Sequence, residues 1–158
     1  MDVMTSIRTR RSVREYDSRP IPPEVMARMT EALRLAPSAC NYQPWKFVIV
    51  TDEALRKQLA EASHRQRFVA EAPVVVVGLG LCDAAYKRMG GDGNSAALDV
   101  AIALDHLSLA AAAEGLGTCW IGAFDKAEVK RLINAPKGAE VVALMPLGYP
   151  ARPELLGP

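Results

Sequence analysis

The strongest constraint on the fold is a stretch at residues 96–114 that is apolar on almost every side of a helix. Gly115 ends the stretch, and only Asp105 and His106 interrupt its apolar central part. Its apolar residues include Ala97, Leu98, Val100, Ala101, Ile102, Leu104, Leu107 and Leu109. A helix of this kind is buried on most of its sides, either in a protein core or against a second chain.

Shorter patterned segments surround this helix. Apolar residues recur at three- and four-residue spacing in some of them, which predicts amphipathic helices, and short runs rich in β-branched residues predict buried strands. The predicted helices are residues 2–10, 23–36, a segment capped by Thr51 or Asp52, 96–114 and 125–134, and the predicted strands are 47–50, 74–77, 117–121 and 141–145. We therefore expect an α+β sandwich in which helices flank a mixed sheet of about four strands.

Composition narrows the class of protein. The chain has 158 residues, of which 50% are hydrophobic and 23% charged, so we expect one globular domain spanning residues 1–158. A net charge of +1 gives no reason to expect nucleic acid or a membrane as a partner. We expect no apolar run to reach the roughly 18 residues of a membrane span. The first six residues lack the apolar core of a signal peptide, so we expect a cytoplasmic protein.

Cysteine and histidine are sparse. Cys40, Cys82 and Cys119 are scattered and form no Cys-x-x-Cys pair, so a disulfide framework is not expected. His64 and His106 have no cysteine or acidic neighbour at the spacing of metal ligands. We expect no metal site and no histidine-based catalytic triad.

The strand 74–77 runs into Gly78-Leu79-Gly80, which has the form of the first part of a dinucleotide-binding fingerprint. That fingerprint needs a third glycine three residues later, where Asp83 stands, and no helix begins at once. Two glycines that end a buried strand are the simpler interpretation, and the dinucleotide motif is the less favoured alternative.

The segment Arg10 to Arg14 concentrates three guanidinium groups and the hydroxyl of Ser12 in five residues. Arginine presents a planar fork of donors that suits phosphate or carboxylate, and a serine hydroxyl adds a further donor. The segment therefore indicates an anionic ligand. The alternative is that the charges only form a solvated helix face.

Four blocks of sequence identify a resemblance. Arg10–Tyr16, Ala36–Phe47, Gly115–Phe124 and Leu147–Pro150 together resemble the nitroreductase family of flavin enzymes, in the order that the family has them. The resemblance implies a three-layer α/β/α sandwich with a mixed, mostly antiparallel sheet. It also implies FMN as cofactor, NAD(P)H as co-substrate and an obligate homodimer.

The same resemblance assigns roles to the basic segment. Arg10 and Ser12 match positions that bind the FMN phosphate and ribityl chain, and Arg11 joins them. Arg14 matches a basic position near flavin N1 and the C2 carbonyl. A cation there stabilises the negative charge that two-electron reduction adds to that edge of the ring.

Two further segments match family positions at the flavin. Pro37, Ser38, Ala39 and Asn41 match the loop that one subunit places over the flavin of the other, where small residues allow close approach to a flat ring. Ile121, Gly122 and Ala123 match the segment near flavin N5, where glycine lets a backbone amide approach. For this last segment the alternative is a turn that needs glycine for its geometry.

The C-terminus departs from the family pattern. Relatives continue past the Gly-Tyr-Pro block to a basic residue that completes the phosphate site, whereas Arg152 is the only basic residue after that block here. We expect either that Arg152 takes this role or that the phosphate site is weaker. The chain is also short in its middle, which predicts an open active site.

The expected activity is a ping-pong transfer of hydride from NAD(P)H through flavin N5 to a nitroaromatic, a quinone or a similar flat acceptor. No side chain is expected to act as a general acid or base. A narrower acceptor, such as an enone or a halogenated phenol, is left open, and so is a non-catalytic flavin store or sensor. We expect a homodimer through helix 96–114, which a substitution such as Leu104→Glu is expected to disrupt.

Overall fold

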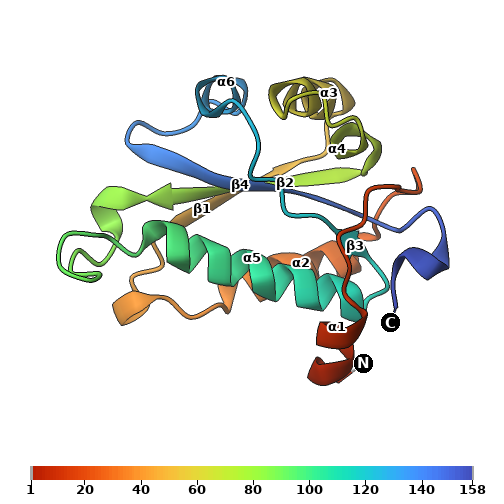
Figure 1. The fold of residues 1–158 in the computed structure, drawn as a ribbon, viewed down its shortest axis with the longest axis horizontal. Coiled ribbons are helices and arrows are strands. Elements are labelled where there is room, and N and C mark those ends of the chain that lie inside the picture. The colour runs from red at the N-terminus through yellow and green to blue at the C-terminus, as the bar shows by residue number, and fades with distance from the viewer. Residues whose placement is uncertain (1, 158) are drawn as a thin grey trace.

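A computed structural model describes residues 2–157 as three layers, with a sheet between two groups of helices (Figure 1). Met1 and Pro158, the ends of the predicted domain, lie outside the described residues. Helices α2 (Pro23–Arg34) and α5 (Ala96–Ala113) cover one face of the sheet. Helices α3 (Glu53–Ala62), α4 (Phe68–Glu71) and α6 (Lys126–Leu132) cover the other. The α/β/α sandwich expected from the sequence is thus confirmed.

The sheet has four strands in the order β1-β2-β4-β3. The strands are β1 (Trp45–Val50), β2 (Val74–Leu81), β3 (Gly117–Thr118) and β4 (Ala139–Gly148), and every named pair is antiparallel. The parallel component is a single isolated bridge between Ser12 and Thr118. The mostly antiparallel character expected from the resemblance is therefore found, with the one parallel contact made by the basic N-terminal segment.

Strand β2 separates the two hydrophobic cores because successive side chains of a strand point to opposite faces. Val74 and Val76 pack with α2 and α5, whereas Val75 and Val77 pack with α3 and α6. These four valines are all buried, with at most 3% of their surface exposed. The valine run thus belongs to a central strand covered on both faces, as the sequence indicates.

The predicted elements agree with the observed ones apart from their boundaries. Asp52, rather than Thr51, caps α3 by accepting the Leu55 N–H, and Asp125 caps α6 by accepting the Glu128 N–H. The one-turn helix α4 was not predicted, because four residues are too few to show a helical period. Strand β2 runs on to Leu81, beyond the predicted end at residue 77.

The part of β2 beyond residue 77 contains two glycines, Gly78 and Gly80, that lie against helix α5. A Cβ added at Gly78 would lie 2.8 Å from Val100 Cγ1 of α5, and one at Gly80 would lie 3.1 Å from Ala96 Cβ. The glycines therefore let α5 lie close on the sheet. The strand is followed by a three-residue 3-10 helix, Cys82–Ala84, and not by the α-helix that a dinucleotide fingerprint requires. The structure supports the simpler interpretation of these glycines, although they lie inside the strand and not at its end.

Helix α5 lies on the sheet by one face only. Leu104 is fully buried and would lie 3.1 Å from a Cβ at Gly78, whereas Leu98 is 54% exposed and Ile102 is 39% exposed. Leu104 contacts the sheet, so any effect of Leu104→Glu on the dimer would come through the core and not through a direct contact with a partner. Leu98 and Ile102 are the side chains of α5 that a partner could cover.

Helix α5 also corrects the expectation that no apolar stretch is long enough to cross a membrane. By length and composition alone its 18 residues pass that test, with a mean hydropathy of 1.5. Half of this stretch is buried inside the protein against the sheet. The structure therefore accounts for its apolar character as that of a core helix.

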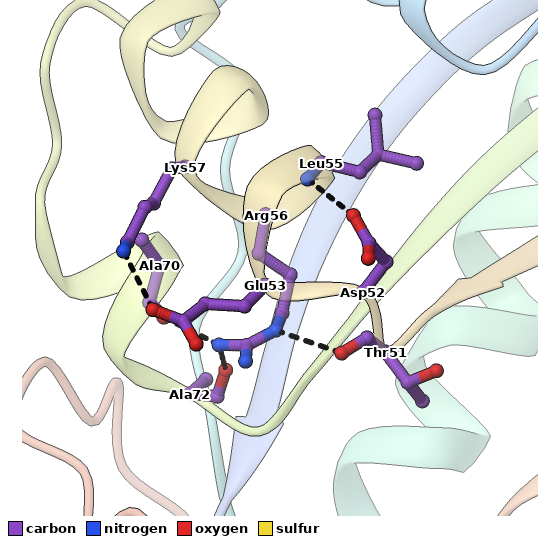
Figure 2. A network of polar contacts seen from close by, with 8 residues as sticks. All are labelled: Thr51, Asp52, Glu53, Leu55, Arg56, Lys57, Ala70 and Ala72. Atoms are coloured by element: carbon purple, nitrogen blue, oxygen red, sulfur yellow. Dashed lines mark hydrogen bonds and ion pairs between the residues drawn. The ribbon is translucent and has the colours of Figure 1, made fainter.

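Arg56 of α3 bonds to the end of α4, just before the start of β2 (Figure 2). Its Nη1 donates to the carbonyl oxygens of Ala70 at 2.5 Å and Ala72 at 2.6 Å, and its Nε donates to Thr51 O at 3.3 Å. One guanidinium thereby satisfies a carbonyl just before α3 and two carbonyls at the end of α4. A short helix such as α4 needs such a tertiary contact, since four residues hardly form a helix alone.

We predict that Arg56→Met lowers the free energy of unfolding by about 1.5–3 kcal/mol, the range for hydrogen bonds to a charged group. The matched control is Lys57→Met, which removes an exposed ion pair to Glu53 and is expected to cost at most about 1 kcal/mol. Urea denaturation of both variants measures the difference. Equal losses of stability would contradict the role of Arg56.

Candidate active site

Helix α1 (Val3–Thr9) delivers the basic segment to the edge of the sheet. Asp2 caps this helix by accepting the Thr5 N–H, and after Thr9 the chain becomes extended. Val13 N–H donates to Thr118 O at 2.9 Å, so the segment lies beside β3. Val13 is buried and its neighbours Ser12 and Arg14 are exposed, as expected for an extended strand-like segment.

A cavity of about 220 Å³ opens between this segment, α5 and the sheet. Its lining residues are Arg10, Ser12, Asp105, Ser108, Thr118, Trp120 and Met145. Two predicted residues, Arg10 and Ser12, therefore share one cavity with hydroxyl groups from α5 and β3. Larger pockets lie around Arg56 and between α3 and α6, but none of the site residues predicted from the sequence lines them.

The arginines of the basic segment differ in what they contact. Arg11 Nη1 donates to the carbonyl oxygens of Arg8 at 2.7 Å and Arg10 at 2.8 Å, so Arg11 caps the end of α1. Among the ion pairs of residues 2–157, none involves Arg10 or Arg14. These two guanidinium groups are available to an anionic ligand, whereas the guanidinium of Arg11 is bonded to carbonyl oxygens at the end of α1.

Arg152 lies away from the cavity lining. Its Nη2 is 3.0 Å from Glu15 Oε1 and 3.1 Å from Glu15 Oε2, and Glu154 lies 4.0 Å from its Nη1. The C-terminal segment does return toward α1, because Gly157 N–H donates to Thr9 O. The role of Arg152 at a phosphate stays a prediction, and it would require Arg152 to leave Glu15.

Cys119 lies behind the basic segment and is 2% exposed. Burial raises the pKa of its thiol, while the positive charge of Arg14 and a hydrogen bond with Ser12 act in the opposite direction. Burial likewise raises the pKa of Tyr16, whose hydroxyl donates to Val13 O at 2.7 Å. Both groups therefore stay protonated and help to fix the segment, and neither is a nucleophile.

The segment Ile121–Ala123 follows Trp120 directly. Ile121 is 2% exposed, and it exchanges two backbone hydrogen bonds with Leu144 of β4. Its side chain belongs to the core, so only its backbone can contribute to a site. Gly122 and Ala123 are exposed, and Gln66 Nε2 donates to Ala123 O at 3.2 Å.

Gly122 is not required by the fold. It is absent from the glycines with a positive φ, and an added Cβ would meet nothing closer than Trp120 Nε1 at 3.6 Å. No hydrogen bond within residues 2–157 uses its N–H. These facts disfavour the alternative of a turn that needs glycine for its geometry and favour an amide left open to a ligand.

The loop with Pro37, Ser38, Ala39 and Asn41 lies at the opposite end of α5 from the basic segment (Figure 1). Its Ala39 N–H donates to Asp99 Oδ1 in the first turn of α5, about 9 Å along the helix axis from Asp105 of the cavity. One chain therefore does not bring this loop to Arg10 and Ser12. This arrangement suits a loop that contributes to the site of a second chain.

Together, the layered fold and the cluster of basic and hydroxyl groups define an α+β protein with a candidate site for an anionic ligand. The model of the nitroreductase family matches residues 7–67 and 63–149. The chain belongs to the nitroreductase family, as the four sequence blocks indicate.

Individual relatives agree with this assignment. A Thermus thermophilus protein named NADH dehydrogenase is 33% identical over 96% of this chain and 88% of its own length. A Thermotoga neapolitana protein named iodotyrosine deiodinase is 27% identical over 92% of this chain and 87% of its own. The similarity to these relatives thus extends over nearly the whole chain. The relatives are named for different reactions.

Solved structures share the fold. A nitroreductase family protein from Clostridium novyi NT has a TM-score of 0.84 and 30% identity, over 95% of this chain and 86% of that one. The NADPH:FMN oxidoreductase of Vibrio harveyi, solved with NAD⁺, has a TM-score of 0.86 and 26% identity, over 99% of this chain and 72% of that one.

The structure adds residues that sequence reasoning missed. Asp105, Ser108, Thr118 and Trp120 line the cavity with Arg10, and Gln66 contacts the Ile121–Ala123 segment. Asp105 could have been found, because it is a polar interruption of an apolar helix. Within residues 2–157 no group of three or more His, Cys, Asp or Glu side chains is arranged to bind a metal ion.

Two glycines provide a test of the Ile121–Ala123 segment. We predict that Gly122→Ala changes the free energy of unfolding by less than about 0.5 kcal/mol, because its Cβ has room. Gly117→Ala is the matched comparison, since its Cβ would lie 2.6 Å from Val13 Cγ2 and is expected to cost about 1–3 kcal/mol. Chemical denaturation measures both, and a comparable loss of stability in Gly122→Ala would show that the fold itself needs this glycine.

Proposed function

We propose that this protein is an FMN-dependent oxidoreductase that takes its electrons from NAD(P)H. The observation that carries the proposal is the cavity in which Arg10 and Ser12 of the basic segment meet the hydroxyl groups of Ser108 and Thr118. The names of the relatives support the same cofactor and co-substrate, since one is an FMN reductase [NAD(P)H] and another an NADPH:FMN oxidoreductase.

The side chains present fit FMN. The guanidinium of Arg10 and the hydroxyl of Ser12 suit its phosphate and the first part of its ribityl chain. Ser108 and Thr118 add hydroxyl groups to the same cavity, and the carboxylate of Asp105 can accept from ribityl hydroxyls but would repel the phosphate. We therefore propose that Arg10 binds the phosphate and that the residues of α5 bind the ribityl chain.

The remaining groups serve the flavin ring. Arg14 is exposed, lies close enough to Cys119 to influence its thiol, and has its guanidinium 6.0 Å from the Phe68 ring centroid. Its positive charge stabilises negative charge at the ring edge. The Gly122 N–H is free to approach the opposite edge. FMN held by these residues would supply hydride transfer from NAD(P)H to an acceptor, so the chain needs no acidic or basic catalytic side chain.

The acceptor is a flat molecule such as a nitroaromatic or a quinone, taken up in a ping-pong cycle. The exposed side chain of Trp120 beside the cavity offers an aromatic surface for such a molecule. A relative named iodotyrosine deiodinase supports an aromatic acceptor, since the compound in its name is aromatic.

The protein works as a homodimer. The basic segment and the Pro37–Asn41 loop lie at opposite ends of α5, so each chain has two half-sites (Figure 1). Between them α5 exposes Leu98 and Ile102, and α1 exposes Val3, Met4 and Ile7. A two-fold partner placed on this apolar face would bring the loop of one chain to the basic segment of the other.

The direct test is to mix the purified protein with FMN and then with NADH or NADPH and a nitroaromatic or a quinone. We expect a bound flavin spectrum and continuous NAD(P)H consumption that depends on the acceptor. A protein that takes up no FMN would overturn the proposal. Flavin binding without NAD(P)H consumption would instead support a flavin store or sensor.

Arg14 provides a test of the flavin orientation. Arg14→Ala is expected to lower the flavin reduction potential and slow reduction by NAD(P)H more than it weakens FMN binding. The substitution removes a charge-assisted hydrogen bond to the ring, worth about 1.5–3 kcal/mol. Spectroelectrochemistry measures the potential, with Arg34→Ala on the exposed end of α2 as control. An unchanged potential would remove Arg14 from the ring edge.

The proposed interface is tested by a charge on the exposed face of α5. Leu98→Glu is expected to weaken dimerisation by several kcal/mol, because a two-fold interface would contain two unpaired carboxylates. Leu35→Glu, at the end of α2 and 60% exposed, is the matched control. Sedimentation should show monomers for the first variant and dimers for the second. Dimers of Leu98→Glu with normal FMN affinity would exclude this face.

A further inference from the structure

Asp99 is a buried carboxylate without an evident role in the core. It lies in the first turn of α5 and is 3% exposed. Its Oδ1 accepts the Ala39 N–H at 3.1 Å, while its Oδ2 is buried and has no hydrogen-bond partner among residues 2–157. Burying a carboxylate with an unsatisfied oxygen is unfavourable, and an apolar side chain of similar size would fill the same space without that penalty. The bond to Ala39 is therefore what the carboxylate provides.

The loop that Asp99 contacts has an unfavourable backbone conformation. Cys40, Asn41 and Gln43 have φ values of 51°, 55° and 51°, which non-glycine residues rarely adopt. Such conformations persist only where surrounding contacts fix them, and they concentrate at functional sites.

Few contacts fix this loop from outside. Ser38 supplies two bonds within it, because its carbonyl accepts the Asn41 N–H at 2.9 Å and its hydroxyl accepts the Gln43 N–H at 2.9 Å. Among the hydrogen bonds of residues 2–157, that from Ala39 to Asp99 is the one that ties the loop to α5.

We propose that Asp99 is the positioning residue that fixes the Pro37–Gln43 loop in the conformation that covers the cofactor of the partner subunit. The inference rests on the proposed function, because it assigns the loop to that cofactor. Asp99 acts through the Ala39 amide and touches neither flavin nor substrate. Since α5 also forms the proposed interface, Asp99 couples the position of the loop to the helix that the two chains share.

The experiment compares Asp99→Ala and Asp99→Asn with a matched control, Asp52→Ala. Asp52 also accepts a backbone N–H, that of Leu55 at 2.8 Å, but it caps α3 in the other helical layer. Two quantities are measured for each protein: amide hydrogen exchange of residues 39–41 without ligand, and the dissociation constant of FMN.

We expect Asp99→Ala to accelerate exchange of these amides, and to raise the FMN dissociation constant, by about tenfold to a hundredfold, as expected when a hydrogen bond to a charged acceptor is removed. Asp99→Asn retains an acceptor oxygen, so its effects should be several-fold only. Asp52→Ala should alter neither quantity. The loop amides should change while the slowest-exchanging amides of β2 and β4 do not, which separates positioning from general destabilisation.

Unchanged loop exchange in Asp99→Ala, or equal effects in Asp52→Ala, would overturn the inference. If Asp99→Ala does not fold, Asp99→Asn decides, because the weaker neutral acceptor should still accelerate exchange at Ala39 and an unchanged rate would exclude the role. Failure of the unaltered protein to bind FMN would overturn the proposed function, and loop exchange would then still show whether Asp99 fixes the loop. Faster loop exchange with unchanged FMN affinity would show that the loop does not cover the cofactor.

Discussion

The close contact between α5 and the centre of the sheet is the constraint on which the rest of the structure depends. It is possible because Gly78 and Gly80 present no side chain to Val100 and Ala96. Once α5 lies there, its buried face fills the first core, and its opposite face, with Leu98, is left open. The same placement puts Asp99 beside the Pro37–Asn41 loop and Asp105 at the cavity. A single packing contact thus sets the core, the exposed face and the separation of the half-sites.

The second constraint is the docking of the extended N-terminal segment on β3. Val13 is buried beside Gly117 and bonded to Thr118, and this brings residues near position 12 to residues near position 120. Alternation along the segment then decides which side chains are free. Ser12 faces the cavity, while Val13 enters the core. The site therefore consists of side chains supplied at the edge of a rigid sheet.

Sequence patterns predicted much of this arrangement, and their failures have physical causes. The caps at Asp52 and Asp125 and the valine strand are local features, and each was found close to where the pattern indicated. The helix α4 escaped prediction because it is stabilised by Arg56, a tertiary contact. Leu104 was chosen to test the interface although it is buried against the sheet, because a helix that is apolar all round has no periodic signal to distinguish its faces.

The layered α+β class and a basic segment suited to an anion could be predicted from residue types and local spacing, and the family from the resemblance of four sequence blocks. Which arginines are available depends on the tertiary structure. Arg11 turns back onto α1, whereas Arg10 lines the cavity, although the two are neighbours in the chain. It also decided that Asp99, one acidic residue among many, is buried against the loop at Ala39. Burial and hydrogen-bond partners come from segments far apart in sequence, and no local pattern specifies them.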